Sequence, residues 1–181
     1  MNKVIVKGIT VTIMAVILSA CSARVDHYTP SADNAVALRS IDKKVNVSDI
    51  TATTEVTSVM CRLANPVIMP NSEAINEYIE NAFIDELKMA NKFDENSKIT
   101  LSGNLNNTTS SSGMTDGHWS FDMKVESSNG ESFNVVHRHE YSGSFLGGVA
   151  CRENMPDEFE PAVEELINAI VTDSRFTSLL N

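Results

Sequence analysis

Two histidines two residues apart have the clearest capacity for chemistry in this sequence. His137 and His139 flank Arg138 in a run of alternating apolar and polar residues. Residues two apart on a β-strand point to the same face, so the two imidazoles are expected to be near neighbours. Such a pair can bind zinc or copper when a carboxylate or a third histidine completes the ligand set. This pattern supports a small-ligand or metal-binding protein as the alternative function.

A plainer interpretation of the two histidines is favoured. His118 lies on a neighbouring expected strand but should point to the opposite face, so it does not complete a ligand set. We expect His137 and His139 to lie at the edge between a sheet and a helix layer. There they would be hydrogen-bonded and would stack on Trp119 and Phe121. The sequence therefore predicts no metal and no cofactor.

Catalytic motifs are missing from the sequence. Ser144 lies in Gly-Ser-Phe-Leu-Gly at 143–147, which lacks the Gly-x-Ser-x-Gly spacing of a nucleophile elbow. The carboxylate pairs Asp157-Glu158 and Glu164-Glu165 fall on an expected helix and are interpreted as a solvated face. We therefore predict no catalytic residue and no enzymatic activity.

The first residues of the chain have the pattern of an export signal. Lys3 and Lys7 are basic, and residues 9–18 are apolar except for two threonines. The apolar run is about ten residues long, whereas a membrane span needs roughly 20. It ends in Leu18, Ser19, Ala20 and Cys21. An ordinary signal peptide ends in small residues at its cleavage site, but here a cysteine follows them.

This ending resembles the lipobox of bacterial lipoproteins. The resemblance implies that the Cys21 thiol accepts a thioether-linked lipid and that signal peptidase II removes residues 1–20. It also implies that the new amino group is acylated, and several acyl chains make a stable anchor because each buried CH₂ contributes roughly 0.8 kcal/mol. Ser22 stands where an aspartate would retain the protein in the inner membrane. We expect an outer-membrane lipoprotein facing the periplasm.

The charge of the chain limits its partners. The formal net charge is −10, and removal of Lys3 and Lys7 with the signal would leave −12. This balance argues against nucleic acid as a partner and against attraction to anionic headgroups. Residues 21–44 are predicted to be a lipidated N-terminus and flexible tether, although packing of 35–38 on the domain is left open. Residues 45–181 are predicted to form one periplasmic domain, which is a common domain size.

Only Cys61 and Cys151 remain as cysteines after Cys21. Two cysteines in an oxidising periplasm predict one disulfide. Each lies shortly before an expected helix and beside an arginine, and two helices that begin at one end of a sandwich bring their leading segments together. Two buried free thiols, or a bridge to another chain, stay open as alternatives.

The expected elements follow from hydrophobic periodicity. They are strands near 45–52 and 56–63, a helix from 73 to about 91, strands near 99–105, 119–125 and 133–141, a helix from 157 or 158, and a short helix near 176–180. Ser72 is the expected N-cap of the first long helix. The polar stretch 106–117 is interpreted as a strand extension plus a turn, with a binding loop as the alternative. Gly147-Gly148 is interpreted as a break before the last helix.

The register of the last hairpin can be predicted. A three-residue loop at 128–130, with Gly130 left-handed, places Ser127 opposite Glu131. Four facing pairs follow from it: Trp119 with His139, Phe121 with His137, Met123 with Val135, and Val125 with Phe133. A two-residue loop would mix apolar with charged positions, so the longer loop is preferred.

The order of elements predicts an α+β two-layer sandwich, in which two main helices cover one face of an antiparallel sheet. Behind a lipobox, this order resembles small periplasmic lipoproteins such as LptE, which assembles lipopolysaccharide, and YajG. Cys61, Cys151, Gly-His-Trp-Ser-Phe at 117–121 and Ser-Ser-Asn-Gly at 127–130 are also similar to a group of uncharacterised proteobacterial lipoproteins. These resemblances imply a fold and a compartment.

The expected function is a non-enzymatic accessory role in the cell envelope. The protein would bind or brace a partner protein at the periplasmic face of the outer membrane, to which the lipid on Cys21 attaches it. The exposed sheet edge near 99–110 is the expected docking site, because unpaired main-chain groups there can accept a strand.

Overall fold

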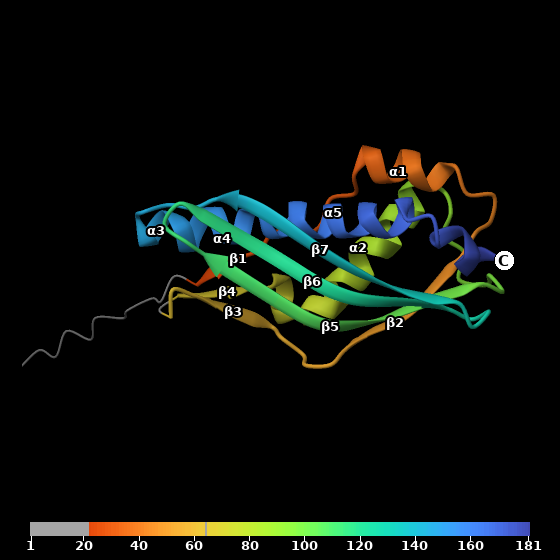
Figure 1. Cartoon of the computed structure of the whole chain (residues 1–181), viewed down its shortest axis with the longest axis horizontal. Coiled ribbons are helices and arrows are strands. Elements are labelled where there is room, and N and C mark those ends of the chain that lie inside the picture. The colour runs from red at the N-terminus through yellow and green to blue at the C-terminus, as the bar shows by residue number, and fades with distance from the viewer. Residues whose placement is uncertain (1–21, 64) are drawn as a thin grey trace, which may run out of the picture.

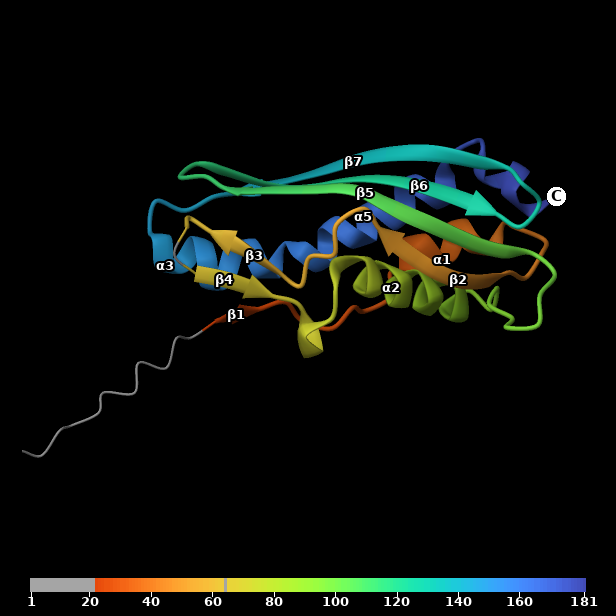
Figure 2. The same ribbon diagram turned by 90° about the horizontal axis from the view of Figure 1, so that it is seen from below.

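A four-stranded sheet forms one layer of the molecule. The computed structural model describes residues 22–63 and 65–181. The sheet has the order β2-β5-β6-β7, and the bounds of its strands are Asn46–Ala52 (β2), Thr100–Ser112 (β5), Asp116–Ser127 (β6) and Ser132–Ser142 (β7). Two long helices, α2 (Ile75–Met89) and α5 (Phe159–Thr172), pack on the same side of it (Figure 2). The α+β two-layer sandwich is therefore confirmed.

A smaller sheet lies at one end of the molecule (Figure 1). Its order is β1-β4-β3, with bounds Ala23–Arg24 (β1), Asn65–Ile68 (β4) and Ser58–Cys61 (β3). The expected second strand near 56–63 thus exists as β3, but it pairs antiparallel with β4 and not with the main sheet. Arg62 and Leu63 follow it in the left-handed region, with φ of 48° and 57°.

One strand pairing differs from the expectation of a wholly antiparallel sheet. β2 runs parallel to β5, with Val47 opposite Leu101 and Ala52 opposite Leu105. Parallel neighbours need a long crossover connection, and the chain between β2 and β5 supplies one that contains α2. The alternation of apolar residues identifies the buried face of a strand but carries no information on its direction, so the sequence did not predict this pairing.

The hairpin register is confirmed. Trp119 faces His139 and Phe121 faces His137 in the β6–β7 pair. The Ser127 N–H donates to the Glu131 carbonyl at 3.0 Å, and Gly130 has a φ of 93°. A left-handed residue at this position favours glycine, which has no Cβ to clash. The three-residue loop therefore sets which β7 side chains face the helices.

The N-terminal segment is not the free tether that the sequence predicted. A helix, α1 (Ala32–Arg39), forms there, and Ser31 caps it by accepting from the Asp33 N–H at 3.2 Å. Ala35 and Leu38 are buried, so the open question about 35–38 is settled in favour of packing. The segment from residue 22 onward belongs to the folded domain.

A buried carboxylate on α2 holds this segment in place. Glu86 is fully buried, and its Oε1 accepts three hydrogen bonds. The donors are the Tyr28 hydroxyl at 2.6 Å, the Ser31 N–H at 2.8 Å and the Asn34 side-chain amide at 3.0 Å. Burial, with the hydrogen bond and negative charge of Glu86, raises the pKa of Tyr28, so its hydroxyl stays a donor. These polar contacts span more than 50 residues of sequence and leave no periodic signal, which explains the wrong prediction.

Two helix starts also differ from expectation. α2 begins at Ile75, and Ser72 lies instead in a 3₁₀ turn, η1 (Pro70–Ser72), with a φ of 61°. The Glu77 carboxylate takes over the capping role by accepting from the Ala74 N–H at 2.8 Å. Gly147-Gly148 begins a helical segment and does not break one. That segment comprises α3 (Gly147–Val149), a π-helical turn η2 (Ala150–Asn154) and α4 (Met155–Asp157).

The core lies between the sheet and the helices. The ring of Phe159, at the start of α5, meets those of Tyr78, Trp119 and Phe121 edge-on, with centroids 4.9 to 6.0 Å apart. The Trp119 indole N–H donates to the Met155 carbonyl at 3.0 Å, which satisfies it inside the core. The expected short helix at the C-terminus is present as η3 (Phe176–Leu180), with Phe176 and Leu179 buried.

Candidate functional site

The expected lipidation motif lies outside the described residues. Leu18, Ser19, Ala20 and Cys21 therefore stay a sequence prediction. Within residues 22–63 and 65–181, no helix has the length and apolar character needed to cross a membrane. The described chain begins at Ser22 and enters β1 at once, where Ala23 pairs with Val67 of β4.

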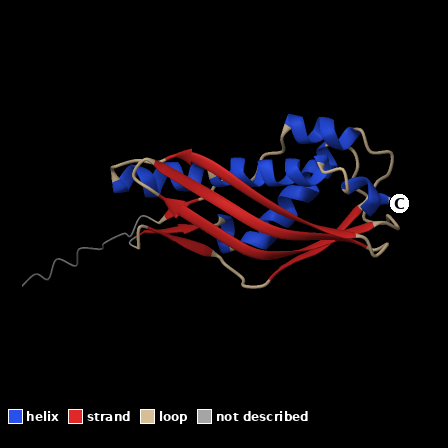
Figure 3. Ribbon diagram, in the orientation of Figure 1, coloured by secondary structure: helices blue, strands red, loops and turns tan. Residues whose placement is uncertain are grey.

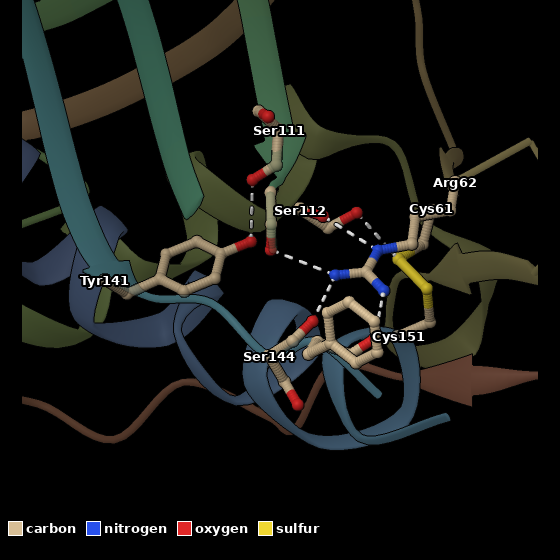
Figure 4. The surroundings of a disulfide bond; sticks show 9 residues. Cys61, Arg62, Ser111, Ser112, Tyr141, Ser144 and Cys151 are labelled. Carbon is tan, nitrogen blue, oxygen red and sulfur yellow. Dashed lines mark hydrogen bonds between the residues drawn. A yellow bond between two sulfur atoms is a disulfide. The ribbon is translucent and has the colours of Figure 1, made fainter. Parts of the chain in front are cut away.

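The predicted disulfide between Cys61 and Cys151 is confirmed. The two Cα atoms are 5.5 Å apart, and both residues are fully buried. The bond joins the end of β3 to η2, and so ties the smaller sheet to the C-terminal helical segment (Figure 4). The Ser112 hydroxyl lies 3.0 Å from the Cys61 sulfur.

Arg62, next to the disulfide, binds four main-chain carbonyls (Figure 4). Its Nε donates to Ser112 at 2.9 Å, and its Nη2 donates to Gly113 at 3.0 Å and to Ser144. Its Nη1 reaches Phe145 at 3.4 Å. One guanidinium thus fastens together three turns, at 62–63, 112–115 and 142–149, which we call the tip end. Sequence reasoning missed this role because main-chain acceptors have no side-chain signature.

Tyr141 makes a second stabilising hydrogen bond beside the tip end. Its hydroxyl donates to the Ser111 carbonyl at 3.0 Å across the sheet. Burial raises the pKa of Tyr141 to about 12, so the phenol keeps its proton and remains a donor. The ring lies over Gly117, where a Cβ would come within 2.2 Å of it. This contact explains the glycine in the Gly-His-Trp-Ser-Phe motif.

His137 and His139 face two carboxylates of α5 and its N-cap. The His139 Nε2 lies 2.9 Å from Glu158 Oε2, and its Nδ1 lies 3.0 Å from Glu165 Oε2. The His137 Nε2 is also 3.0 Å from Glu165 Oε2. We call these four residues the histidine cluster. The interpretation of the carboxylate pairs as a purely solvated face is therefore wrong for Glu158 and Glu165.

The histidine cluster is electrostatically coupled. Burial opposes protonation of His139, but its hydrogen bonds to Glu158 and Glu165 outweigh burial and raise its pKa. Burial likewise opposes ionisation of Glu165, but the hydrogen bonds from His139 and His137 outweigh it and lower its pKa. The cluster therefore favours an imidazolium paired with carboxylate.

The surroundings of the two imidazoles differ in part from the expectation. They are hydrogen-bonded at the junction of sheet and helix, as predicted. In the described chain His139 stacks with Tyr141, at a centroid distance of 6.4 Å, while Trp119 and Phe121 surround Phe159 instead. Both ring nitrogens of His139 face carboxylate oxygens. No group of three or more His, Cys, Asp or Glu among the described residues is arranged to hold a metal ion.

Ser144 takes part in a turn. Its hydroxyl accepts from the Leu146 N–H at 3.2 Å, while its carbonyl accepts from Arg62. These contacts stabilise the connection between β7 and α3.

The sheet edge expected near 99–110 is free over only part of that range. β2 covers residues 100–105 of β5, and the Thr53 N–H donates to the Leu105 carbonyl at 3.0 Å. The register with β6 then shifts at Asn106, and at the far end Arg62 binds Ser112. Within the described chain, residues 107–111 pair with β6 alone, and Asn106 is the unpaired residue of the register shift, so 106–111 has no strand on its other side. Figure 3 shows the chain between β2 and β3 as a loop beside this stretch, which we call the open edge.

The side to which each main-chain N–H and C=O of the open edge points follows from strand geometry. Alternate residues of an antiparallel strand direct both their N–H and their C=O to the same side. Because the Ser112 carbonyl points away from β6 to Arg62, the main-chain groups of Ser110 and Thr108 point the same way. Those of Thr109 point to β6.

A recess of about 250 Å³ lies beside the open edge. Two of its lining residues, Asn76 of α2 and Thr108 of β5, each carry a buried side-chain oxygen without a hydrogen-bond partner. The Asn76 amide nitrogen donates to the Ile50 carbonyl at 2.8 Å, which leaves its oxygen directed elsewhere. An unpaired buried polar atom costs roughly 1–3 kcal/mol. A ligand that supplies donors there would recover part of that cost.

Comparison with known proteins identifies a structure of similar fold. No family model matches the chain, and no curated protein matches it. The crystal structure of protein XCC0632 from Xanthomonas campestris, of the family DUF330, is similar with a TM-score of 0.50. The identity is 11%, and the match covers 87% of this chain and 94% of that one. At this identity the likeness shows a shared fold alone.

Proposed function

We propose that this protein is a lipid-anchored accessory protein of the cell envelope that binds an extended segment of a partner protein. The lipobox at 18–21 supports the anchor, and Ser22 supports the outer membrane with the domain in the periplasm. A disulfide between Cys61 and Cys151 fits an oxidising compartment. The observation that carries the partner-binding role is the open edge beside the recess of Asn76 and Thr108.

Strand addition is the binding mode that this geometry supports. The open edge is six residues long, which corresponds to roughly 20 Å of extended chain. Main-chain hydrogen bonds to Thr108 and Ser110 would supply affinity, and the recess would admit a polar side chain of the partner. The edge itself carries Asn, Thr and Ser without a charge, so it sets no requirement for a charged partner segment.

A proline at Thr108 tests this mode directly. Thr108→Pro removes an N–H that points to the open edge, and edge strands tolerate proline because no ladder bond is lost. We expect it to abolish partner crosslinking in cells from a photoreactive residue at the exposed Asn107, while the melting temperature stays near that of the wild type. Thr108→Ser keeps both the N–H and the side-chain oxygen in the recess and is the matched control, with crosslinking retained. Unchanged crosslinking in Thr108→Pro contradicts strand addition.

The anchor has an independent test. Cys21→Ala removes the thiol that would accept the lipid, so the precursor should stay unprocessed and unlabelled by palmitate. Wild-type protein should carry the label and sediment with outer membranes. A normal lipid signal on the Cys21→Ala variant would show that the lipobox interpretation is wrong.

The role that we propose is non-enzymatic, and the small-ligand or metal-binding alternative is not advanced. Carboxylates face both ring nitrogens of His139 and the Nε2 of His137, so a metal there would have to displace these contacts. Submicromolar zinc or copper binding in isothermal titration, lost in His137→Ala, would restore that alternative. Substrate turnover by the purified protein, lost on mutation of His137 or Ser144, would overturn the non-enzymatic role.

A further inference from the structure

Exposed apolar side chains gather at the tip end. Leu63 is 93% exposed and Phe145 is 79% exposed, and Leu146 and Met114 are each 64% exposed. They come from all three turns of the tip end. Isolated exposed apolar residues are ordinary, but a cluster of them marks an interaction surface.

The cluster is held as one surface. Arg62 precedes Leu63 directly, and its guanidinium binds the carbonyl of Gly113, next to Met114, and that of Phe145. The disulfide fixes the strand that leads into Arg62. The four apolar side chains therefore project from turns whose backbones cannot separate independently.

The chain enters the fold at this same end. β1 runs parallel to β4, with Ala23 opposite Val67, so β1 begins at the end of the smaller sheet that carries Asn65 and the Arg62–Leu63 turn. Figure 1 shows the described N-terminus beside the β3–β4 turn and α3, and opposite the C-terminus. Two residue steps separate Cys21 from Ala23, which span at most about 7 Å. A lipid on Cys21 would consequently emerge next to the apolar cluster.

The charge pattern of the tip end also differs from that of the whole chain. Its three turns contain no aspartate or glutamate, although the chain has 24 acidic residues and a net charge of −10. The exposed Asp116 directly follows the turn at 112–115 and pairs with Ser142. The charge of Arg62 is directed to carbonyl oxygens of the protein itself. The four apolar side chains thus come from turns without acidic residues, and Asp116 lies at the margin of the tip end.

We propose that the tip end lies in the bilayer surface to which the protein is anchored, with Leu63, Met114, Phe145 and Leu146 in the boundary between headgroups and acyl chains. Apolar side chains beside a lipid anchor supply the second membrane contact that a stable interfacial position needs. The inference rests on the proposed lipidation of Cys21. It fixes the orientation of the domain, because β1 follows the anchor directly, and places the open edge close above the membrane.

Fluorescence quenching in vesicles tests the inference. Phe145→Trp is introduced into the full lipoprotein, purified from membranes and reconstituted in phosphatidylethanolamine–phosphatidylglycerol vesicles whose acyl chains carry bromine. Val136→Trp is the control, because Val136 on β7 is 71% exposed but lies outside the tip end. The native Trp119 is fully buried and gives a constant background. We expect a blue shift and loss of emission for Phe145→Trp and neither change for Val136→Trp.

Every outcome of this experiment is informative. Mass spectrometry of the N-terminal peptide reports lipidation separately. If the lipid is present and Phe145→Trp is not quenched, the bilayer inference is wrong while the anchor stands. If the lipid is absent, the anchor proposal fails and the bilayer inference, which rests on it, fails with it. A concentration-dependent blue shift without vesicles would show that a second copy covers the cluster, which overturns the inference.

Discussion

Two polar clusters join the sheet to the helical layer by different means. At the tip end, the guanidinium of Arg62 binds main-chain carbonyls beside the Cys61–Cys151 bond. In the histidine cluster, imidazoles of β7 meet carboxylates of α5 and its N-cap. An arginine stays protonated at every physiological pH and a carbonyl does not titrate, whereas imidazole changes its charge near neutrality. The first junction is therefore permanent and the second is conditional.

The position of each cluster explains the difference. Leu63 and Phe145 at the tip end are exposed on the surface of the domain, so its turns gain little from packing within the fold and depend on covalent and charge-assisted bonds. The histidine cluster lies over a packed aromatic core around Phe159, which holds the sheet and α5 together without it. A junction that a core already secures can tolerate groups whose charge varies with pH.

Removal of the disulfide should have the largest effect. The bond closes a separation of 90 residues, and the chain-entropy argument for such a loop gives roughly 4–5 kcal/mol as an upper figure. We expect the double variant Cys61→Ala, Cys151→Ala to show a clear fall in melting temperature and in urea midpoint. Wild-type protein with reductant should behave alike. Equal midpoints for the variant and the wild type would refute the permanent junction.

The disulfide could be predicted from the sequence, and most of its surroundings could not. The predicted export and lipidation of Cys21 would leave two cysteines, so the expected pairing follows from counting. The contacts of Arg62 depend on the positions of Gly113 and Phe145 after folding, and every residue type provides a carbonyl. The burial of Glu86 was not predicted for a similar reason. In the sequence, a buried glutamate of a helix cannot be distinguished from an exposed one, because its hydrogen-bond partners are known only from the folded structure.

Loss of the Arg62 side chain should have an intermediate effect. Arg62→Met leaves carbonyls at the tip end without their donor, and unpaired polar groups cost roughly 1–3 kcal/mol. Arg152→Met is the matched control, because Arg152 also follows a disulfide cysteine but is exposed. Urea unfolding should show destabilisation in Arg62→Met and almost none in Arg152→Met. Arg62→Lys should recover little, since one ammonium group cannot reproduce the planar fork of the guanidinium. Equal losses in the two methionine variants would contradict the role of Arg62.

The hairpin and the histidine cluster show what could and could not be predicted from residue periodicity. Alternation along β6 and β7, together with Gly130, predicted every facing pair of the β6–β7 hairpin correctly. The same register placed His137 and His139 on one face. Glu158 and Glu165 were missed as their partners, although seven residues are close to two helical turns and so share a face. Matching that helical spacing to the strand spacing of the histidines would have found the cluster.

The smallest effect should come from the histidine cluster, and its signature is its dependence on pH. The folded pKa of His139 is raised above 6.5, so its pairing stabilises the fold below that pH and is lost as pH rises through the raised value. The folded pKa of Glu165 is lowered below 4.5, so its contribution is present above that pH and is lost as pH falls through the lowered value. The stability difference between wild type and His139→Gln should therefore be largest between about pH 4.5 and 6.5.

The stability difference between wild type and His139→Gln should stay below about 1 kcal/mol, because Glu165 is half exposed and solvent screens the pair. His118→Gln supplies a control of opposite sign. Burial, with the positive charge of Arg138, lowers the pKa of His118, so protonation of His118 disfavours the folded state and its replacement should help most in acid. Urea midpoints of the three proteins, measured from pH 4 to 9, separate the two trends. A His139→Gln difference that does not change with pH would make the histidine cluster as permanent as the tip end, and the contrast between the two junctions would disappear.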